Sequence, residues 1–253
     1  MNHAYLSLES GRKVAVAEAL LHRIDRMYRM RCPAAVYPFL MRVIREAETG
    51  NLATSVALEL FDVVESFLVR RAVVGYEPTG LHALFKNVWS EIADSPSGEA
   101  FANAARQRPT IQWPKDDTFV EGLRTRPLAR SNICGYLLVE IDRMLPGDDP
   151  MDRPTIEHVV PQSLPDNGSW ARAFDEEQHK ELVHTLANLV PMSGTLNSSM
   201  QAAPYDAKRE RFLAESMYCT PRHVAQTYRQ WNPETVGARA EELVKIAVKR
   251  WPD

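Results

Sequence analysis

Acidic, imidazole and amide side chains in the last hundred residues have the types and spacing needed for metal-assisted hydrolysis. Glu157 and His158 are adjacent, Asn188 follows 30 residues after His158, and Asn197 stands nine residues after Asn188. Neutral imidazole suits the deprotonation of water because its pKa lies near the working pH. Carboxylate and amide oxygens suit a hard cation such as Mg²⁺. A base for water and a divalent cation at the phosphate are the main requirements of phosphodiester hydrolysis.

Two short apolar runs predict the strands that would carry these residues. Thr155–Val160 is rich in β-branched residues and is broken by Pro161, and Leu186–Met192 is the second run. The predicted order is strand, long loop, strand, helix. Because adjacent side chains of a strand point to opposite faces, Glu157 and His158 can reach one site only where the strand ends. Pro161 predicts that end.

The joint spacing of these residues resembles the His-Asn-His (HNH) nuclease motif. Glu157–Ser163 is similar to the acid-His-x-x-Pro-Gln-Ser run in the HNH domain of the CRISPR effector nucleases, which also share the interval between Asn188 and Asn197. The chain is more similar to the C-terminal domain of the GmrSD-type modification-dependent restriction endonucleases, whose relatives include the phosphorothioate-sensing Ssp defence nucleases. Further residues that carry this resemblance are Trp170, His184–Leu189, Lys208–Arg209, Trp231, Arg239–Ala240 and, upstream, Glu65–Arg71 with Gly75.

The resemblance implies a role for each matching residue. His158 would be the general base that activates water. Asn197 would be a ligand of Mg²⁺ or Mn²⁺, with Glu157 as the second ligand or, alternatively, as a carboxylate that orients a neighbour. Asn188 would brace the loop that orients His158, a role that overlaps with an ordinary turn-forming asparagine. Lys208 would contact phosphate or stabilise charge in the transition state, or else be an ordinary solvated lysine.

The resemblance also implies a biological setting. The chain would be an endonuclease that attacks phage or modified DNA in antiviral restriction, and a single-metal site would nick one strand at a time. The nucleotide-hydrolysing sensor typical of the family would be a domain or subunit absent from this chain, which is then a fragment or a stand-alone version. The alternative is a catalytically silent module that binds DNA or a partner. An RNA nuclease would use the same active-site chemistry.

One residue departs from the family pattern. Ala187 stands where the family usually has a glycine before the asparagine. Alanine is tolerated there if the backbone is not left-handed, because only glycine adopts that conformation at little cost.

Composition and charge restrict how DNA is bound and where the protein works. Apolar residues make up 45% and charged residues 25%, as in soluble globular proteins. The net charge is −3, and residues 151–253 hold 12 Lys and Arg against 14 Asp and Glu, so DNA would need a local basic patch or another domain. No apolar run is long enough to cross a bilayer, no export signal stands at the N-terminus, and the three cysteines are scattered. We therefore expect a cytoplasmic protein.

Helical periodicity predicts the elements that position the site. It predicts helices over residues 15–30, 35–48, 56–74, 81–92, 119–124, 132–144, 207–217, 222–231 and 235–251. Turn formers in Pro146–Pro150 predict a boundary between a helical connector or support domain, 1–147, and a nuclease domain, 148–253. The predicted fold class is mainly α with a small α+β part. It combines a helical N-terminal domain with a ββα-metal (HNH, His-Me finger) nuclease domain wrapped by C-terminal helices.

Other basic and aromatic residues carry weaker predictions. His179 and His184 are five residues apart, not the four of a zinc-protease helix, so we expect them to be surface or core histidines. We expect Arg70 and Arg71 to form a salt-bridging helix face, which we favour over a contact with DNA. Three arginines near Pro127 either contact phosphates or lie in a solvated loop: Arg124, Arg126 and Arg130. Three tryptophans are expected in the core: Trp170, Trp231 and Trp251.

Overall fold

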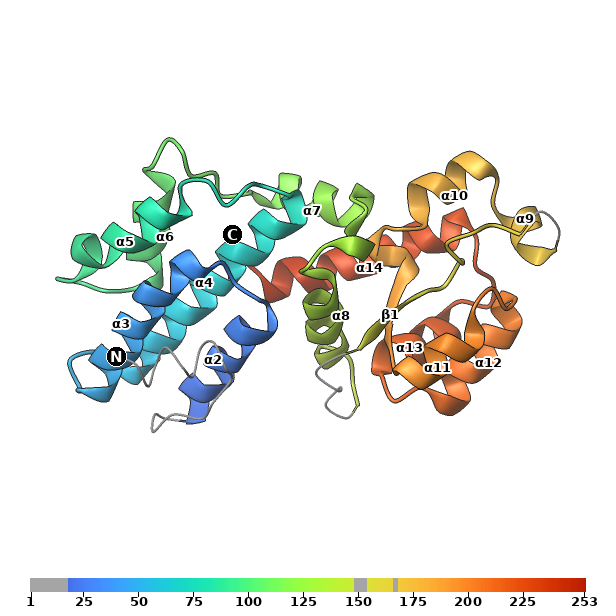
Figure 1. The fold of residues 1–253 in the computed structure, drawn as a ribbon, viewed down its shortest axis with the longest axis horizontal. Coiled ribbons are helices and arrows are strands. Elements are labelled where there is room, and N and C mark those ends of the chain that lie inside the picture. Colours follow the sequence, from blue (N-terminus) through green and yellow to red (C-terminus); the bar gives the residue numbers. More distant parts are fainter. Residues whose placement is uncertain (1–17, 148–153, 166–167) are drawn as a thin grey trace. The chain divides into compact units, whose positions relative to one another are not determined.

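A computed structural model describes residues 18–147, 154–165 and 168–253 (Figure 1). These residues are mainly helical with one two-stranded antiparallel sheet, as the sequence predicts. The chain forms two compact units, one comprising Met1–Lys115 with Trp251–Asp253 and the other Asp116–Arg250. The predicted domain boundary after residue 147 falls partly outside the described residues and stays a prediction. None of the described helices is long and apolar enough to cross a membrane.

The described residues of the first unit form five α-helices and one short 3-10 helix. They are α2 (Glu18–Arg29), η1 (Ala34–Val36), α3 (Tyr37–Glu48), α4 (Thr54–Val74), α5 (Leu81–Ile92) and α6 (Gly98–Arg106). The predicted helix over 81–92 has the same bounds as α5, and α4 ends at Gly75, whose φ of 81° is the left-handed conformation that glycine allows. Helix α6 was not predicted.

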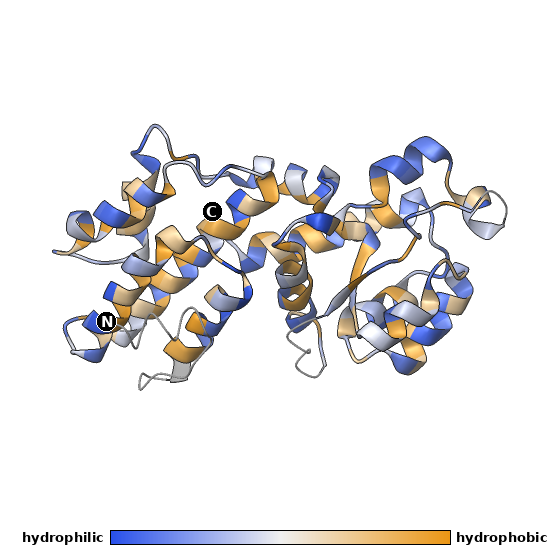
Figure 2. Cartoon of the chain, viewed as in Figure 1, coloured by the Kyte–Doolittle hydropathy of each residue, from blue (hydrophilic) through white to orange (hydrophobic). Residues whose placement is uncertain are grey.

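Helix α4 is the centre of the first unit. It packs against α2, α3 and α6, and Val64–Arg71 is buried throughout. Figure 2 shows the hydrophobic residues that run along this helix. Phenylalanines from four helices meet in the core beside it, with ring centroids 5.5 to 6.5 Å apart. They are Phe39, Phe67, Phe85 and Phe101.

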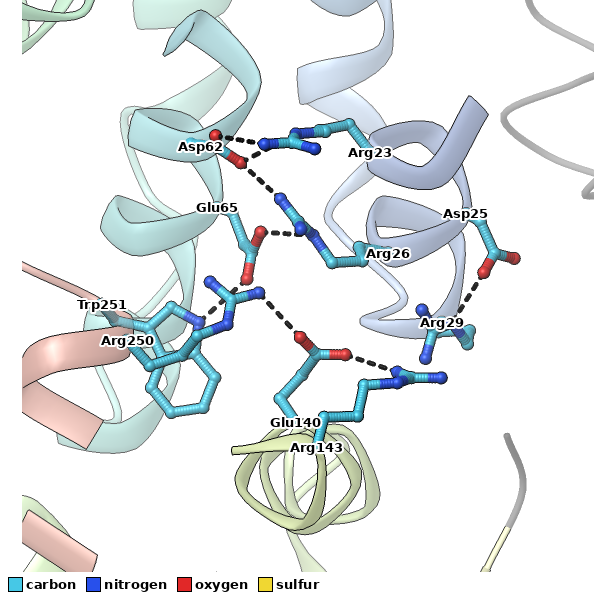
Figure 3. Close-up of polar contacts among 10 residues, drawn as sticks. All are labelled: Arg23, Asp25, Arg26, Arg29, Asp62, Glu65, Glu140, Arg143, Arg250 and Trp251. Atoms are coloured by element: carbon cyan, nitrogen blue, oxygen red, sulfur yellow. Dashed lines mark hydrogen bonds and ion pairs between the residues drawn. The ribbon is translucent and has the colours of Figure 1, made fainter. Parts of the chain in front are cut away.

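Buried charged side chains on α4 tie the end of the chain to this unit. Glu65 is paired with Arg26 at 2.9 Å and accepts a hydrogen bond from the Trp251 indole at 2.9 Å (Figure 3). Arg70 donates to the carbonyls of Trp251 and Pro114. Arg71 likewise donates to main-chain carbonyls and is buried. Arg70 and Arg71 are therefore buried inside the first unit, where both bind main-chain carbonyls.

The second unit holds the sheet and the remaining helices. They are α7 (Asp116–Thr125), η2 (Leu128–Arg130), α8 (Cys134–Arg143), β1 (Thr155–His158), α9 (Ser169–Ala173), α10 (Glu176–Leu182), η3 (Leu186–Asn188), β2 (Leu189–Met192), α11 (Gly194–Met200), α12 (Tyr205–Glu215), α13 (Cys219–Thr227) and α14 (Pro233–Arg250). Strand β1 pairs with β2 so that Glu157 faces Val190 and His158 faces Leu189. The order β1, β2, α11 is strand, strand, helix. That these three elements form a ββα-metal fold stays a prediction.

Helix α14 fixes the entry to β2. The guanidinium of Arg239 is buried and donates to the carbonyl of Ala187 at 2.7 Å and to that of Leu189 at 2.8 Å. The backbone at Ala187 does not have a positive φ, so alanine stands there without strain. At the other end of α14, Arg250 pairs with Glu140 of α8, which also binds Arg143 (Figure 3). These contacts join α14, α8 and the sheet into one packed unit.

Candidate active site

Glu157 and His158 point in different directions from the end of β1. Glu157 Oε1 accepts from Lys208 Nζ at 2.5 Å, and Lys208 also donates to the main-chain carbonyl of His158 at 2.8 Å. The side chain of Lys208 is 0% exposed and that of Glu157 is 7% exposed. The solvated-lysine alternative for Lys208 is therefore wrong, since its ammonium is a buried partner of the strand.

Burial opposes the charges of this pair. Desolvation is the main cause that raises the pKa of Glu157, and attraction to Lys208 partly offsets it. Desolvation also lowers the pKa of Lys208, with the Glu157 carboxylate acting in the opposite direction. Each charged group is therefore retained in the interior mainly by the other.

Asn188 uses its whole side-chain amide to hold the segment after His158. Its Oδ1 accepts from the Val160 amide at 2.8 Å and from the Trp231 indole at 3.1 Å. Its Nδ2 donates to the carbonyls of Val160 at 3.1 Å and Val183 at 2.9 Å. Asn188 is 0% exposed, so these bonds satisfy an amide that water does not reach.

Asn197 connects α11 to β1. Its Nδ2 donates to the Thr155 hydroxyl at 3.0 Å and to the Ile156 carbonyl at 3.1 Å. Thr155 and Glu157 are two residues apart and share a face of the strand. Asn197 therefore lies over the face that carries Glu157.

His158 has a different set of neighbours. Its Nε2 lies 3.2 Å from Nδ1 of His184, and the two rings are almost perpendicular. Its pKa is lowered to about 4, first by burial and then by the positive charges of neighbours that include His184, Lys208 and Arg130. His158 as a residue is 9% exposed, and with this pKa its imidazole is neutral at pH 7, which is the state that a general base requires.

The short helix η2 places Arg130 near His158 and His184. The Ala129 amide donates to the His184 carbonyl at 3.2 Å, which fixes η2 beside the histidine pair. Arg130 is exposed, and its charge lowers the pKa of both histidines. Arg124 differs because its guanidinium is bound by Glu241 through two hydrogen bonds of 2.7 Å. Of these two arginines, Arg130 is the one whose positive charge lowers the pKa of His158 and of His184.

The match to a family model decides what kind of protein carries this site. Residues 113–246, more than half of the chain, match the model described as GmrSD restriction endonucleases, C-terminal domain. The chain belongs to this family. Membership indicates a nuclease of the restriction-endonuclease type with DNA as the substrate, in a family whose members typically depend on a divalent metal ion. No curated protein matches the chain.

The residues matched to the GmrSD family include all five side chains that were predicted from the sequence to act in catalysis or metal binding. They are Glu157, His158, Asn188, Asn197 and Lys208. In the structure, Glu157, Asn197 and Lys208 gather on one side of β1, and Asn188 holds the segment after the strand. Within the described part of the chain, no hydrogen bond joins the His158 imidazole to Glu157 or to Asn197. The five residues therefore form two neighbouring groups around the end of one strand.

The donor chemistry on the Glu157 side fits a hard cation. Asn197 donates through Nδ2, so its Oδ1 is left to accept, and Glu157 supplies a carboxylate on the same face. Mg²⁺ commonly takes one or two protein oxygens and keeps several waters. No cluster of three or more His, Cys, Asp or Glu side chains that could hold a metal occurs among the described residues. A bound ion would have to share the Glu157 carboxylate with Lys208.

His184 is the residue that the sequence prediction missed. We expected a surface or core histidine, whereas it contacts the predicted general base directly. The signal available was its position four residues before Asn188, because Asn188 was already predicted to lie near His158. The pattern of apolar and polar residues along the chain does not show where the side chain of a single half-exposed histidine points. The contact between His184 and His158 could therefore not be predicted.

Proposed function

We propose that this GmrSD-family chain is an HNH-type, metal-dependent DNA endonuclease with His158 as the general base. The observation that carries the proposal is the position of His158, a buried imidazole at the end of a strand whose following residues are held by Asn188. Burial lowers the pKa of His158 to about 4, which favours the neutral form at pH 7. A base must stay unprotonated and must keep a fixed direction toward water, and this arrangement provides both.

The chain's own residues divide the work of the reaction. His158 takes a proton from the attacking water, and Asn188 keeps the backbone beside His158 in place. Asn197 and Glu157 are the groups that would hold Mg²⁺ or Mn²⁺, which when bound supplies charge neutralisation at the scissile phosphate and the leaving oxygen. Lys208 holds Glu157 and the His158 carbonyl. A direct phosphate contact by Lys208 would require its buried ammonium to become exposed.

The product and setting follow from the same proposal. A site with one metal ion cuts one strand at a time, so nicking is the expected primary product. We place the reaction in the cytoplasm, in antiviral, modification-dependent restriction of phage or modified DNA. An NTPase or sensor domain or subunit outside this chain is the proposed partner.

The second candidate is a catalytically silent module that binds DNA or a partner. The ion pair between Glu157 and Lys208 favours it, because a cation already occupies a carboxylate that the metal would need. The two candidates differ in whether the chain consumes its substrate or only binds it.

Plasmid nicking distinguishes the two candidates. Supercoiled DNA is incubated with the chain in Mg²⁺, in Mn²⁺ and in EDTA, and open-circular DNA is measured, with DNA binding measured in parallel. The endonuclease predicts open-circular product with a metal ion and none in EDTA. DNA binding with no nicking in either metal would support the silent module and contradict the proposal.

A further inference from the structure

The contact between His158 and His184 restricts where their protons can lie. At 3.2 Å, Nε2 of His158 and Nδ1 of His184 are within hydrogen-bonding distance, so one nitrogen donates and the other accepts. A neutral imidazole has one N–H, and the direction of this bond therefore fixes the tautomer of both rings.

Only one of the two directions is compatible with His158 as a base. If His158 Nε2–H donates to His184 Nδ1, the lone pair of His158 Nδ1 is available to accept a proton. If His184 Nδ1–H donates instead, His158 Nδ1 carries the hydrogen and has no lone pair for water. Within the described residues, Nε2 is the His158 ring nitrogen that is hydrogen-bonded. His158 Nδ1 is thus the nitrogen left for the substrate water.

The backbone around His184 is held by the residue that also holds the segment after His158. Asn188 Nδ2 donates both to the Val160 carbonyl, two residues after His158, and to the Val183 carbonyl, one residue before His184. The Ala129 amide donates to the His184 carbonyl as well. One buried amide therefore sets the separation of the two histidine-bearing segments.

We propose that His184 is a positioning residue for the nuclease reaction, accepting a hydrogen bond from Nε2–H of His158 and so presenting Nδ1 of His158 to the attacking water. The inference rests on the proposed function, since it requires His158 to be the base. In the step, the water proton moves to His158 Nδ1 and the water oxygen bonds to phosphorus. The bond from phosphorus to the leaving oxygen breaks, and that oxygen takes a proton from solvent. The imidazolium that forms keeps its Nε2–H bond to His184.

Two substitutions at His184 separate positioning from packing. His184→Leu removes the acceptor, whereas His184→Asn places an amide oxygen where Nδ1 stands. We expect His184→Leu to lower kcat for plasmid nicking by about 10- to 100-fold, part of the 10²–10⁴-fold that a general base contributes, with KM nearly unchanged. His184→Asn should recover most of the loss. His82→Leu, at an exposed histidine of the first unit, is the matched control and should nick as the wild type does.

The tautomer itself provides a readout that needs no cleavage. Long-range ¹H–¹⁵N correlation spectra of the full chain, without DNA, should show His158 in the Nε2–H form in the wild type and in His184→Asn. In His184→Leu the preference should be lost. An Nδ1–H form in the wild type, or equal kcat in His184→Leu and wild type, would overturn the inference. If the wild type shows the Nε2–H form but never nicks DNA, the proposed function fails while the contact stands.

Discussion

At the scale of single residues, burial decides the protonation state of the groups around β1. His158 is neutral because burial and nearby positive charges lower its pKa, whereas burial raises the pKa of Glu157 and Lys208 opposes that rise. Both effects come from removing water from a short strand and its neighbours. The chemistry proposed for the site therefore depends on how completely these side chains are buried.

The lowered pKa of His158 predicts the acid limb of the pH profile. A base acts only when unprotonated, so activity is present above its pKa and is lost as the pH falls through it. With the pKa of His158 lowered to about 4 and that of its acceptor His184 also lowered, the acid limb of kcat/KM for nicking should lie below the ordinary histidine value of 6.5. The profile is measured with saturating metal at each pH. An acid limb centred near 6.5 would show that the free protein does not hold His158 in this state.

The ion pair between Lys208 and Glu157 predicts a large effect on stability. Lys208→Met leaves a buried carboxylate without its partner and should lower the free energy of unfolding by about 3–5 kcal/mol. Urea denaturation measures this, with Lys180→Met, at an exposed lysine of the same unit, as the matched control. In Lys208→Met/Glu157→Gln, which removes both charges, part of the loss should be recovered. Equal stability of Lys208→Met and wild type would contradict the buried pair.

At the scale of elements, the sequence predicted helices that have a full apolar stripe and a marked end. The predicted bounds match α5, and Gly75 ends α4 as expected. Helix α11, which carries Asn197, was missed because only two of its side chains are buried, too few to give a period. Helix α10 has no buried residue at all, and Figure 2 shows it as largely hydrophilic. A short helix that is stabilised by its neighbours has too few buried side chains to show a helical period in the sequence.

The position of η2 predicts a DNA contact by Arg130. The helix is fixed next to His184, and Arg130 is exposed there, so Arg130→Ala should weaken DNA binding whatever the sequence of the DNA. Removing one phosphate contact should also reduce the dependence of log K on log salt by about 1. Arg124→Ala is the control, because Glu241 already binds that arginine. Binding is titrated by fluorescence anisotropy in EDTA at several salt concentrations, and equal salt slopes for Arg130→Ala and wild type would exclude the contact.

At the scale of the whole molecule, the family and the mainly helical fold class could be predicted from the sequence, whereas the long-range pairing of the site could not. The spacing of His158, Asn188 and Asn197 predicted the family that the match over residues 113–246 establishes. The burial of Lys208 depends on Glu157, which lies 51 residues earlier, and His184 reaches His158 across 26 residues. Such contacts arise from packing and leave no local signal. The modest net charge of −3 fits an arrangement in which a local group, including Arg130, provides the positive charge near the site.

The role of His158 as the base is tested most directly by the nicking rate of His158→Ala beside His82→Ala, both measured on supercoiled plasmid with saturating Mg²⁺ or Mn²⁺. Unfolding curves of the two variants serve as the check that each still folds. We expect His158→Ala to lose at least about 100-fold in nicking rate while it still binds DNA, and His82→Ala to retain the wild-type rate. A folded His158→Ala protein that nicks at the wild-type rate would contradict the assignment of His158 as the base.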